Sequence, residues 1–168
     1  MLSGISASPS PRAIQPSSDC SGTEARTSDG CGTIKIVAAL ICDEVGRVLL
    51  VRKRGTAAFM QPGGKRDPGE DDVAALSREI AEELGCRVVG GSIRPLGEFD
   101  AIAANEPGFR VQACLYGIDV VGDIMPSQEI DEAIWIDPAA PPDIVLAPLT
   151  RDHVLPLASM KRVAGNAR

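Results

Sequence analysis

Three glutamates near the middle of the chain have the types and spacing needed to hold a cation. Glu79, Glu82 and Glu83 stand at positions i, i+3 and i+4, so on a helix all three project to one side. Like charges at this spacing cost a helix about 0.2–0.5 kcal/mol per pair, and a bound cation would offset that cost. Carboxylates that share an ion with water and substrate phosphates favour Mg²⁺ or Mn²⁺ over zinc. The alternative is a solvated acidic face, and the three glutamates alone do not separate the two interpretations.

The charges around these glutamates are sorted into adjacent blocks. Residues 67–83 carry seven acids and one base, whereas residues 52–66 carry five bases and no acid. Near their junction lies the turn Pro62-Gly63-Gly64, where missing Cβ atoms let backbone groups approach a ligand closely. This arrangement predicts phosphoryl chemistry, because carboxylates can bind a metal, cationic side chains can bind phosphate oxygens, and the glycine backbone between them can approach the ligand.

A helix over residues 72–84 is expected to carry the glutamates. Val73, Leu76, Ile80 and Leu84 fall on one apolar stripe that should pack on a sheet, and Gly85 is placed to end the helix as its C′ residue. Upstream, the apolar runs 36–42 and 48–51 predict a buried hairpin joined by the turn residues 43–46. Downstream strands are predicted at 87–89, 96–101, 111–118 and 133–136, whereas the glycine-rich residues 55–69 fit neither period.

Composition limits the class of protein. The 168 residues are 44% hydrophobic and 24% charged, which suits one globular domain, and the net charge of −6 argues against a nucleic-acid or anionic-membrane partner. No apolar run is long enough to span a membrane, and no secretory signal precedes the domain, so we expect a cytoplasmic protein. The five cysteines lack a C-x-x-C spacing, which favours reduced thiols.

The chain divides into three expected segments. Residues 1–32 are rich in Ser, Pro and Gly and predict a disordered tail, with a transit peptide as the alternative. Residues 33–140 form the folded domain. Residues 141–168 are a C-terminal extension, Pro-rich at first, in which residues 150–162 favour a helix that Pro156 interrupts and that packs on the domain.

Residues 64–86 resemble the signature of the Nudix hydrolases, G-x5-E-x7-R-E-U-x-E-E-x-G-U, in which U is an apolar residue. The matching positions are Gly64, Glu70, Arg78, Glu79, Ile80, Glu82, Glu83 and Gly85, with Cys86 at the last apolar position. A buried thiol behaves as a small hydrophobe, so Cys86 departs little from the pattern. The resemblance extends over residues 33–137.

This resemblance implies an α/β fold of the Nudix type, an α/β/α sandwich around a mixed β-sheet, with the signature forming a catalytic loop, helix and loop. Members hydrolyse a nucleoside diphosphate linked to a group X. It implies that Glu79, Glu82 and Glu83 bind Mg²⁺ together with the Gly63 carbonyl, and that Arg78 and Glu70 brace the loop against the helix. The family has its general base either on this helix or on a later loop, and we choose Glu79.

Residues outside the signature complete the predicted site. Similar proteins add one carboxylate before a strand that carries Trp, for which Glu129 is chosen here over Asp131 and Glu132; an exposed loop acid is the alternative. Arg52 and Lys53 end a strand that faces the signature in similar proteins and are candidates for binding phosphate or base, with a solvated strand end as the alternative. Lys65 follows the glycine pair and is a candidate for a phosphate.

Substrate class follows by elimination. The proline typical of ADP-ribose hydrolases and the tyrosine typical of dinucleoside polyphosphate hydrolases are absent, which leaves a MutT-like enzyme acting on a nucleoside triphosphate, oxidised or not. Only three Phe, one Tyr and one Trp are available, which argues against an RNA substrate. An ADP-ribose or nucleotide-sugar pyrophosphatase and a non-catalytic nucleotide-sensing module are the alternatives, and the oligomeric state stays open.

Overall fold

The computed structural model describes residues 32–127 and 129–165, so the predicted tail lies almost wholly outside the described residues. Nine strands, two α-helices and one π-helical turn are formed in this part of the chain. In chain order they are β1 (Thr33–Ile41), β2 (Val48–Lys53), β3 (Phe59–Met60), β4 (Gly63–Lys65), α1 (Asp72–Leu84), β5 (Arg87–Val88), β6 (Arg94–Ile102), β7 (Arg110–Ile118), β8 (Val120–Val121), β9 (Ile130–Ile136), η1 (Thr150–Val154) and α2 (Leu155–Gly165).

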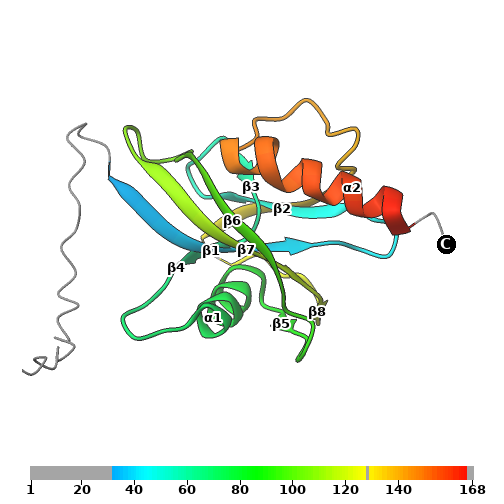
Figure 1. The fold of residues 1–168 in the computed structure, drawn as a ribbon, viewed down its shortest axis with the longest axis horizontal. Helices are drawn as coiled ribbons and strands as arrows, with labels where there is room; N and C mark the ends of the chain where they lie inside the picture. Colours follow the sequence, from blue (N-terminus) through cyan, green and yellow to red (C-terminus); the bar gives the residue numbers. More distant parts are fainter. Residues whose placement is uncertain (1–31, 128, 166–168) are drawn as a thin grey trace, which may run out of the picture.

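The strands form two main sheets between two helices. One sheet has the order β4-β1-β7-β6, in which β1 runs parallel to β7 and the other pairs are antiparallel, and the second has the order β3-β2-β9. A small pair, β5-β8, lies beyond the end of α1. Helix α1 covers one side of the strands and α2 covers the other (Figure 1). This arrangement is the predicted α/β/α sandwich with a mixed sheet.

Strands β1 and β2 are buried on both faces. Val37, Ala39 and Ile41 of β1 pack into the cluster that includes α1, whereas the alternate residues Ala38 and Leu40 pack into the cluster that includes α2. Strand β2 alternates in the same way. Because both faces are covered, these strands have continuous apolar sequences instead of an alternating pattern.

Helix α1 begins and ends at the predicted residues. The Asp71 side chain caps its first turn by accepting a hydrogen bond from the Ala74 N–H at 2.8 Å, and Gly85 ends it in the left-handed conformation, with φ 67°. Leu76, Ile80 and Leu84 are fully buried as predicted. Val73 was expected on the buried face of the helix but is 50% exposed. Helical periodicity gives the direction in which a side chain points, but it does not show how far the sheet extends along the helix.

The predicted hairpin of β1 and β2 is wrong. The turn between them forms, with Asp43 Oδ1 accepting hydrogen bonds from the backbone N–H groups of Val45 and Arg47, but a single bridge between Cys42 and Val48 follows it. β7 pairs with one edge of β1 along its whole length, and β4 pairs with the middle of the other edge, whereas β2 pairs with β3 and β9 in the second sheet.

Two unpredicted strands come from the glycine-rich segment. β3 pairs with β2 and β4 pairs with β1, and β4 therefore carries the Gly63-Gly64 turn to the edge of the mixed sheet beside α1. At the other end of the chain, Pro156 does not interrupt the helix as predicted. The chain is continuously helical over residues 148–165, and the turn that precedes Pro156, η1, is π-helical, a local departure from α-helical hydrogen bonding at the residue that lacks an N–H.

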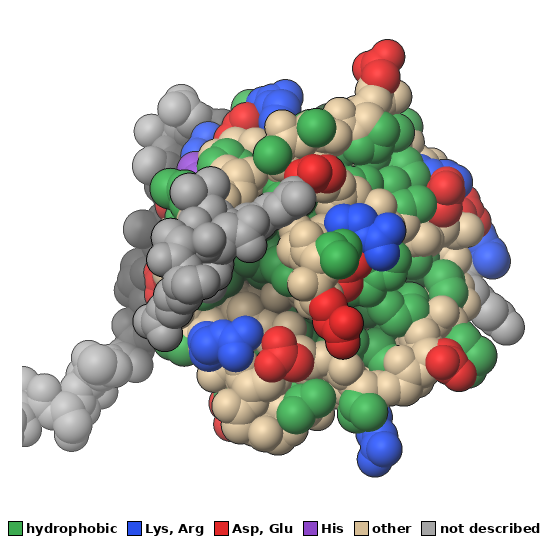
Figure 2. Space-filling model, turned by 90° about the vertical axis from the view of Figure 1, so that its right-hand side faces the viewer, with side chains coloured by type: hydrophobic (Ala, Val, Ile, Leu, Met, Phe, Trp, Pro, Cys, Tyr) green, Lys and Arg blue, Asp and Glu red, His purple; other side chains and the backbone are tan. Residues whose placement is uncertain are grey.

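The surface carries both signs of charge. On the face shown in Figure 2, acidic and basic side chains lie near one another with hydrophobic side chains between them. Within the described residues, no helix is both long and apolar enough to cross a membrane.

Candidate active site

Three of the predicted glutamates, Glu79, Glu82 and Glu129, line a cavity of about 390 Å³ with chemically different ends, and Glu83 lies behind Lys53 and Gly63 of its wall. Its polar end is lined by acids, lysines and the glycine turn: Lys53, Gly63, Gly64, Lys65, Glu79, Glu82 and Glu129. The rest of its lining is mainly apolar (Ile34, Ile36, Met60, Ile102, Val111, Ala147 and Leu149), with Gln61, Asn105 and Glu106 as the polar side chains, and is called the apolar end here. A molecule that is anionic at one end and flat and apolar at the other would complement both ends.

Glu83 is the most enclosed acid of the site, with a side chain only 2% exposed. Its Oε2 accepts a hydrogen bond from the Gly63 N–H at 2.9 Å, and the Lys53 ammonium lies 2.9 Å from Oε1. Burial raises the pKa of Glu83 above its ordinary value, although Lys53 and the Gly63 N–H both favour the charged form. Burial, the largest single effect, would lower the pKa of Lys53, but the charge and hydrogen bond of Glu83 together with the charges of Glu79 and Glu129 outweigh it, so the pKa of Lys53 is raised.

Arg78 ties the loop of the signature to the helix. Its guanidinium donates to both oxygens of Glu70 at 3.0 and 2.9 Å and to the Lys65 carbonyl at 2.9 Å. On the helix it donates to Glu79 Oε1 at 2.9 Å and to Glu82 Oε2 at 3.1 Å. These hydrogen bonds lower the pKa of Glu70, and they fix the direction in which the Glu79 carboxylate points.

The two glycines of the turn are required by different neighbours. At Gly63, which has a φ of 140°, a Cβ atom would lie 2.3 Å from the Val37 carbonyl oxygen, so the backbone of β1 excludes any side chain. At Gly64, a Cβ atom would lie 2.3 Å from Glu79 Oε1. The Glu79 carboxylate therefore rests in the space that the missing side chain leaves.

The residues at the polar end fit a divalent cation. All the available donors are oxygens, the type that Mg²⁺ and Mn²⁺ prefer, and the buried Glu83 Oε1 faces the Lys53 ammonium at 2.9 Å with no further donor among the described residues. Within the described residues, no group of three or more Asp, Glu, Cys or His side chains lies close enough together to hold a metal ion. Arg78 and Lys53 account for this, since each draws carboxylate oxygens toward itself.

The other predicted residues divide between the cavity and the opposite face. Lys53, Lys65 and Glu129 line the polar end. Arg52 does not line it, because successive strand residues point to opposite faces of a sheet. Instead its guanidinium lies 3.3 Å from the carboxylates of Asp131 and of Glu132, which occupies these two rivals of Glu129.

Sequence reasoning missed the lining of the apolar end, including the polar residue Gln61. Gln61 is 6% exposed and follows the apolar residues Ala58, Phe59 and Met60. A polar amide directly after an apolar run could have indicated a buried polar residue. It was overlooked because residues 55–69 were predicted to be irregular. The remaining apolar lining comes from strands and loops that are distant in sequence, and no local pattern joins them.

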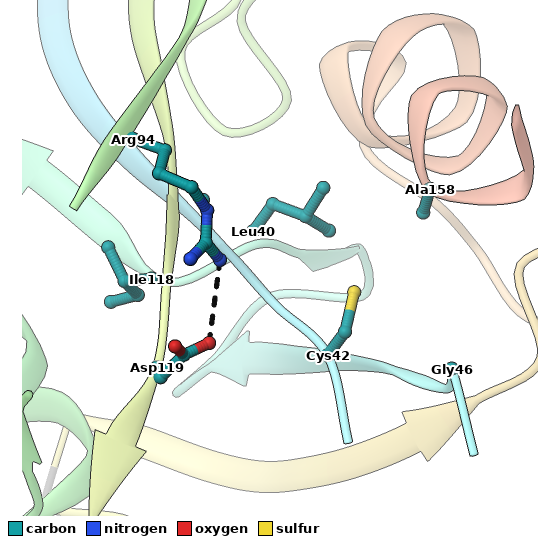
Figure 3. Close-up of a pocket in the computed structure, with 8 residues that line it drawn as sticks. Leu40, Cys42, Gly46, Arg94, Ile118, Asp119 and Ala158 are labelled. Atoms are coloured by element: carbon teal, nitrogen blue, oxygen red, sulfur yellow. Dashed lines mark hydrogen bonds and ion pairs between the residues drawn. The ribbon is translucent and has the colours of Figure 1, made fainter. Parts of the chain in front are cut away.

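A second cavity, of about 240 Å³, lies away from the predicted residues. Leu40, Cys42, Ile118 and Ala158 line it, and Arg94 pairs with Asp119 at its edge at 3.5 Å (Figure 3). Its one described ion pair is largely exposed, so this cavity offers little charge to bind or polarise a substrate.

Comparisons with known proteins agree with this geometry. A family model described as NUDIX domain matches residues 33–157. An 8-oxo-dGTP diphosphatase of Haemophilus influenzae is 32% identical over 71 residues, which cover 40% of this chain and 52% of that protein. An RNA pyrophosphohydrolase of Tolumonas auensis is 37% identical over 59 residues, 35% of this chain and 34% of that protein. The matched segments thus span about half and about a third of these relatives.

The fold has counterparts among solved structures. The crystal structure of the MutT protein from Methanosarcina mazei Go1 is similar with a TM-score of 0.61 at 25% identity, and the match covers 82% of this chain and 98% of that one. Since the family model covers well over half of the residues, this chain belongs to the NUDIX domain family. The predicted family and fold are confirmed, and the named relatives are a diphosphatase and a pyrophosphohydrolase.

Proposed function

We propose that this protein is a Mg²⁺-dependent enzyme that hydrolyses a pyrophosphate bond in a nucleoside triphosphate, oxidised or not, with Mn²⁺ as a substitute cation. One observation carries the proposal: an oxygen-rich, lysine-flanked end and an apolar end meet in one cavity. The triphosphate would occupy the first and the base the second. The substrate is a small nucleotide, and the absence of nucleic-acid and membrane partners and the cytoplasmic location stay predictions from the sequence.

The residues of the polar end have separate tasks in this proposal. Glu79, Glu82, Glu83, Glu129 and the Gly63 carbonyl would hold the cation, which supplies charge neutralisation at phosphate oxygens and makes water more acidic. Arg78 holds Glu79 Oε1 at 2.9 Å, so Glu79 Oε2 is left to accept the proton of the attacking water.

The two lysines would bind the anionic substrate. Lys65 lines the cavity next to the glycine turn, where its ammonium can balance the charge that develops on the leaving phosphate. Lys53 lies between Glu83 and the open cavity, so it can bind a phosphate while still neutralising the buried acid. We propose no substrate role for Arg52, because its guanidinium is paired outside the cavity.

One relative supports the choice of a triphosphate. The 8-oxo-dGTP diphosphatase is named for a nucleoside triphosphate substrate, and its matched segment is 32% identical to this chain. An ADP-ribose or nucleotide-sugar pyrophosphatase is the enzymatic alternative. A non-catalytic nucleotide-sensing module is the other, and the intact signature with its connected Arg78 network favours catalysis over it.

The test is pyrophosphate and phosphate release from a panel of nucleoside triphosphates, ADP-ribose and nucleotide sugars, with Mg²⁺, with Mn²⁺ and with excess chelator. We expect triphosphate turnover that the chelator abolishes. Glu82→Gln and Glu83→Gln should each lower kcat by orders of magnitude with the circular dichroism spectrum retained, whereas Glu98→Gln, an exposed glutamate on β6, should have no effect. Turnover in excess chelator, or full activity of both site variants, would refute the proposal.

A further inference from the structure

A buried amide lines the cavity at its mainly apolar end. Gln61 is 6% exposed and lines the cavity, and the Thr150 hydroxyl donates a hydrogen bond to its Oε1 at 2.6 Å. Thr150 itself is fully buried and lies behind the cavity wall. Burying two polar side chains costs free energy that their mutual hydrogen bond only offsets, so a pair of apolar side chains would line the cavity without that cost.

The fold fixes this pair through the backbone. The Phe59 N–H donates to the Val145 carbonyl at 2.8 Å, and the Ala147 N–H donates to the Phe59 carbonyl at 2.9 Å. These two bonds align the segment before η1 with β3 as a short parallel bridge. Gln61 and Thr150, 89 residues apart in sequence, are thereby held side by side.

The hydrogen bond leaves the amide with a defined polarity. Because Oε1 accepts from Thr150, the part of Gln61 left for a ligand is the Nε2 group, which only donates. Nε2 forms no hydrogen bond to another described residue. Ala147 and Leu149 have apolar side chains, and the polar residues Asn105 and Glu106, which line the same cavity, form no hydrogen bond with Gln61 in the described residues. A donor in apolar surroundings favours a ligand edge that carries acceptors, because an opposing N–H would leave two donors facing each other.

We propose that Gln61 is a specificity-determining residue that selects nucleobases with a carbonyl oxygen, such as hypoxanthine and guanine, over bases with an amino group at the same position. This inference rests on the proposed hydrolysis of nucleoside triphosphates. Guanine presents O6 and N7 as acceptors, whereas adenine replaces O6 with an N6 donor. Thr150 acts as a positioning residue, since its hydroxyl decides which end of the amide faces the base.

The experiment compares ITP with ATP, which differ at position 6 by a carbonyl oxygen against an amino group. For the wild-type protein kcat/KM should be higher for ITP, and Gln61→Met should lower the ITP-to-ATP ratio roughly tenfold to hundredfold, mainly through KM for ITP. Gln61→Glu replaces the donor with an acceptor and should shift the ratio toward ATP. Thr150→Val should lower the ratio with kcat retained, and Thr150→Ser, which keeps the hydroxyl, should restore it.

The outcomes separate this inference from the proposed function. If the wild-type protein hydrolyses no triphosphate, the proposed function fails and this inference fails with it. If it hydrolyses triphosphates but Gln61→Met, Gln61→Glu and Thr150→Val all keep the wild-type ITP-to-ATP ratio, only the assignment of Gln61 is overturned. Calorimetric titration with IMP and AMP gives the same comparison without turnover, and equal affinities for both in the folded wild-type protein would also overturn it.

Discussion

Substituting Gly64 by Ala places a methyl group against Glu79 without straining the backbone. The φ angle of Gly64 lies outside the left-handed region, so alanine can adopt it, but the new Cβ would lie 2.3 Å from Glu79 Oε1 and 2.6 Å from Oε2. To restore ordinary contact the carboxylate must retreat by about 1 Å. A displacement of this size at a reacting group costs roughly 100-fold in rate.

Stability should respond in the opposite direction. A flexible carboxylate can move at little cost, and replacing Gly by Ala restricts the unfolded chain, which stabilises by about 0.4–1 kcal/mol where the conformation is allowed. We therefore expect Gly64→Ala to keep or slightly raise Tm while kcat falls about 100-fold at saturating Mg²⁺. The assay is thermal unfolding by circular dichroism together with pyrophosphate release across a Mg²⁺ titration.

Gly63→Ala is the matched control one residue earlier. Its Cβ would meet the backbone of β1, at 2.3 Å from the Val37 oxygen and 2.9 Å from Ala38 Cα, and its φ of 140° is unfavourable for alanine. We expect a loss of about 1–3 kcal/mol from backbone strain alone, measured as a lower Tm. Wild-type turnover by a folded Gly64→Ala variant would refute the reasoning, because Glu79 would then not depend on the space above Gly64.

Three further substitutions test the charges around the site. Lys53→Met leaves the buried Glu83 carboxylate without its cation and should lower the free energy of unfolding by about 2 kcal/mol in urea denaturation, whereas Lys53→Arg should not; equal stability of all three proteins would contradict this. Asp72 has its pKa lowered from 3.8 to about 2 by hydrogen bonds from Arg66 and Tyr116, so its charged form stabilises the fold above pH 4 and this contribution is lost as the pH falls toward 2. The stability advantage of wild type over Asp72→Asn, about 1 kcal/mol after solvent screening, should therefore shrink between pH 5 and pH 2.5, and a constant difference would contradict the assignment. Arg78→Lys cannot bond Glu70, Glu79 and the Lys65 carbonyl together and should lower kcat at least tenfold with Tm within a few degrees; unchanged kcat would contradict its bracing role.

Local chemistry accounts for the parts of the molecule that could be predicted. Helix α1 was predictable because its cap, its apolar spacing and its terminal Gly85 all lie within a few residues of one another. The cluster of glutamates was predictable for the same reason, since their relation is a helical repeat. Four strands after α1 (β5, β6, β7 and β9) were also found, because β-branched and apolar runs between turns are local signals, whereas the two-residue strand β8 was not predicted.

Pairing between distant segments accounts for what could not be predicted. β1 and β2 have the sequence of a hairpin, but nothing within them shows that β7 takes the edge of β1. Phe59-Met60 and Gly63–Lys65 become strands only because β2 and β1 offer them partners. The contact between Gln61 and Thr150 depends in turn on that pairing, which is why the polar group at the apolar end of the cavity was missed.

The burial of Glu83 shows how the fold and the proposed chemistry are linked. The Glu83 side chain is only 2% exposed, so its charged form is costly, and burial raises its pKa accordingly. A leucine at this position would be buried without that cost. The chain instead supplies the Gly63 N–H to one oxygen and Lys53 to the other. Both partners line the cavity, so the groups that stabilise this buried acid are also groups that would face a phosphate bound there as proposed. A buried acid stabilised only from the cavity side is difficult to explain by packing, and it is what a cation-binding site with an anionic substrate requires.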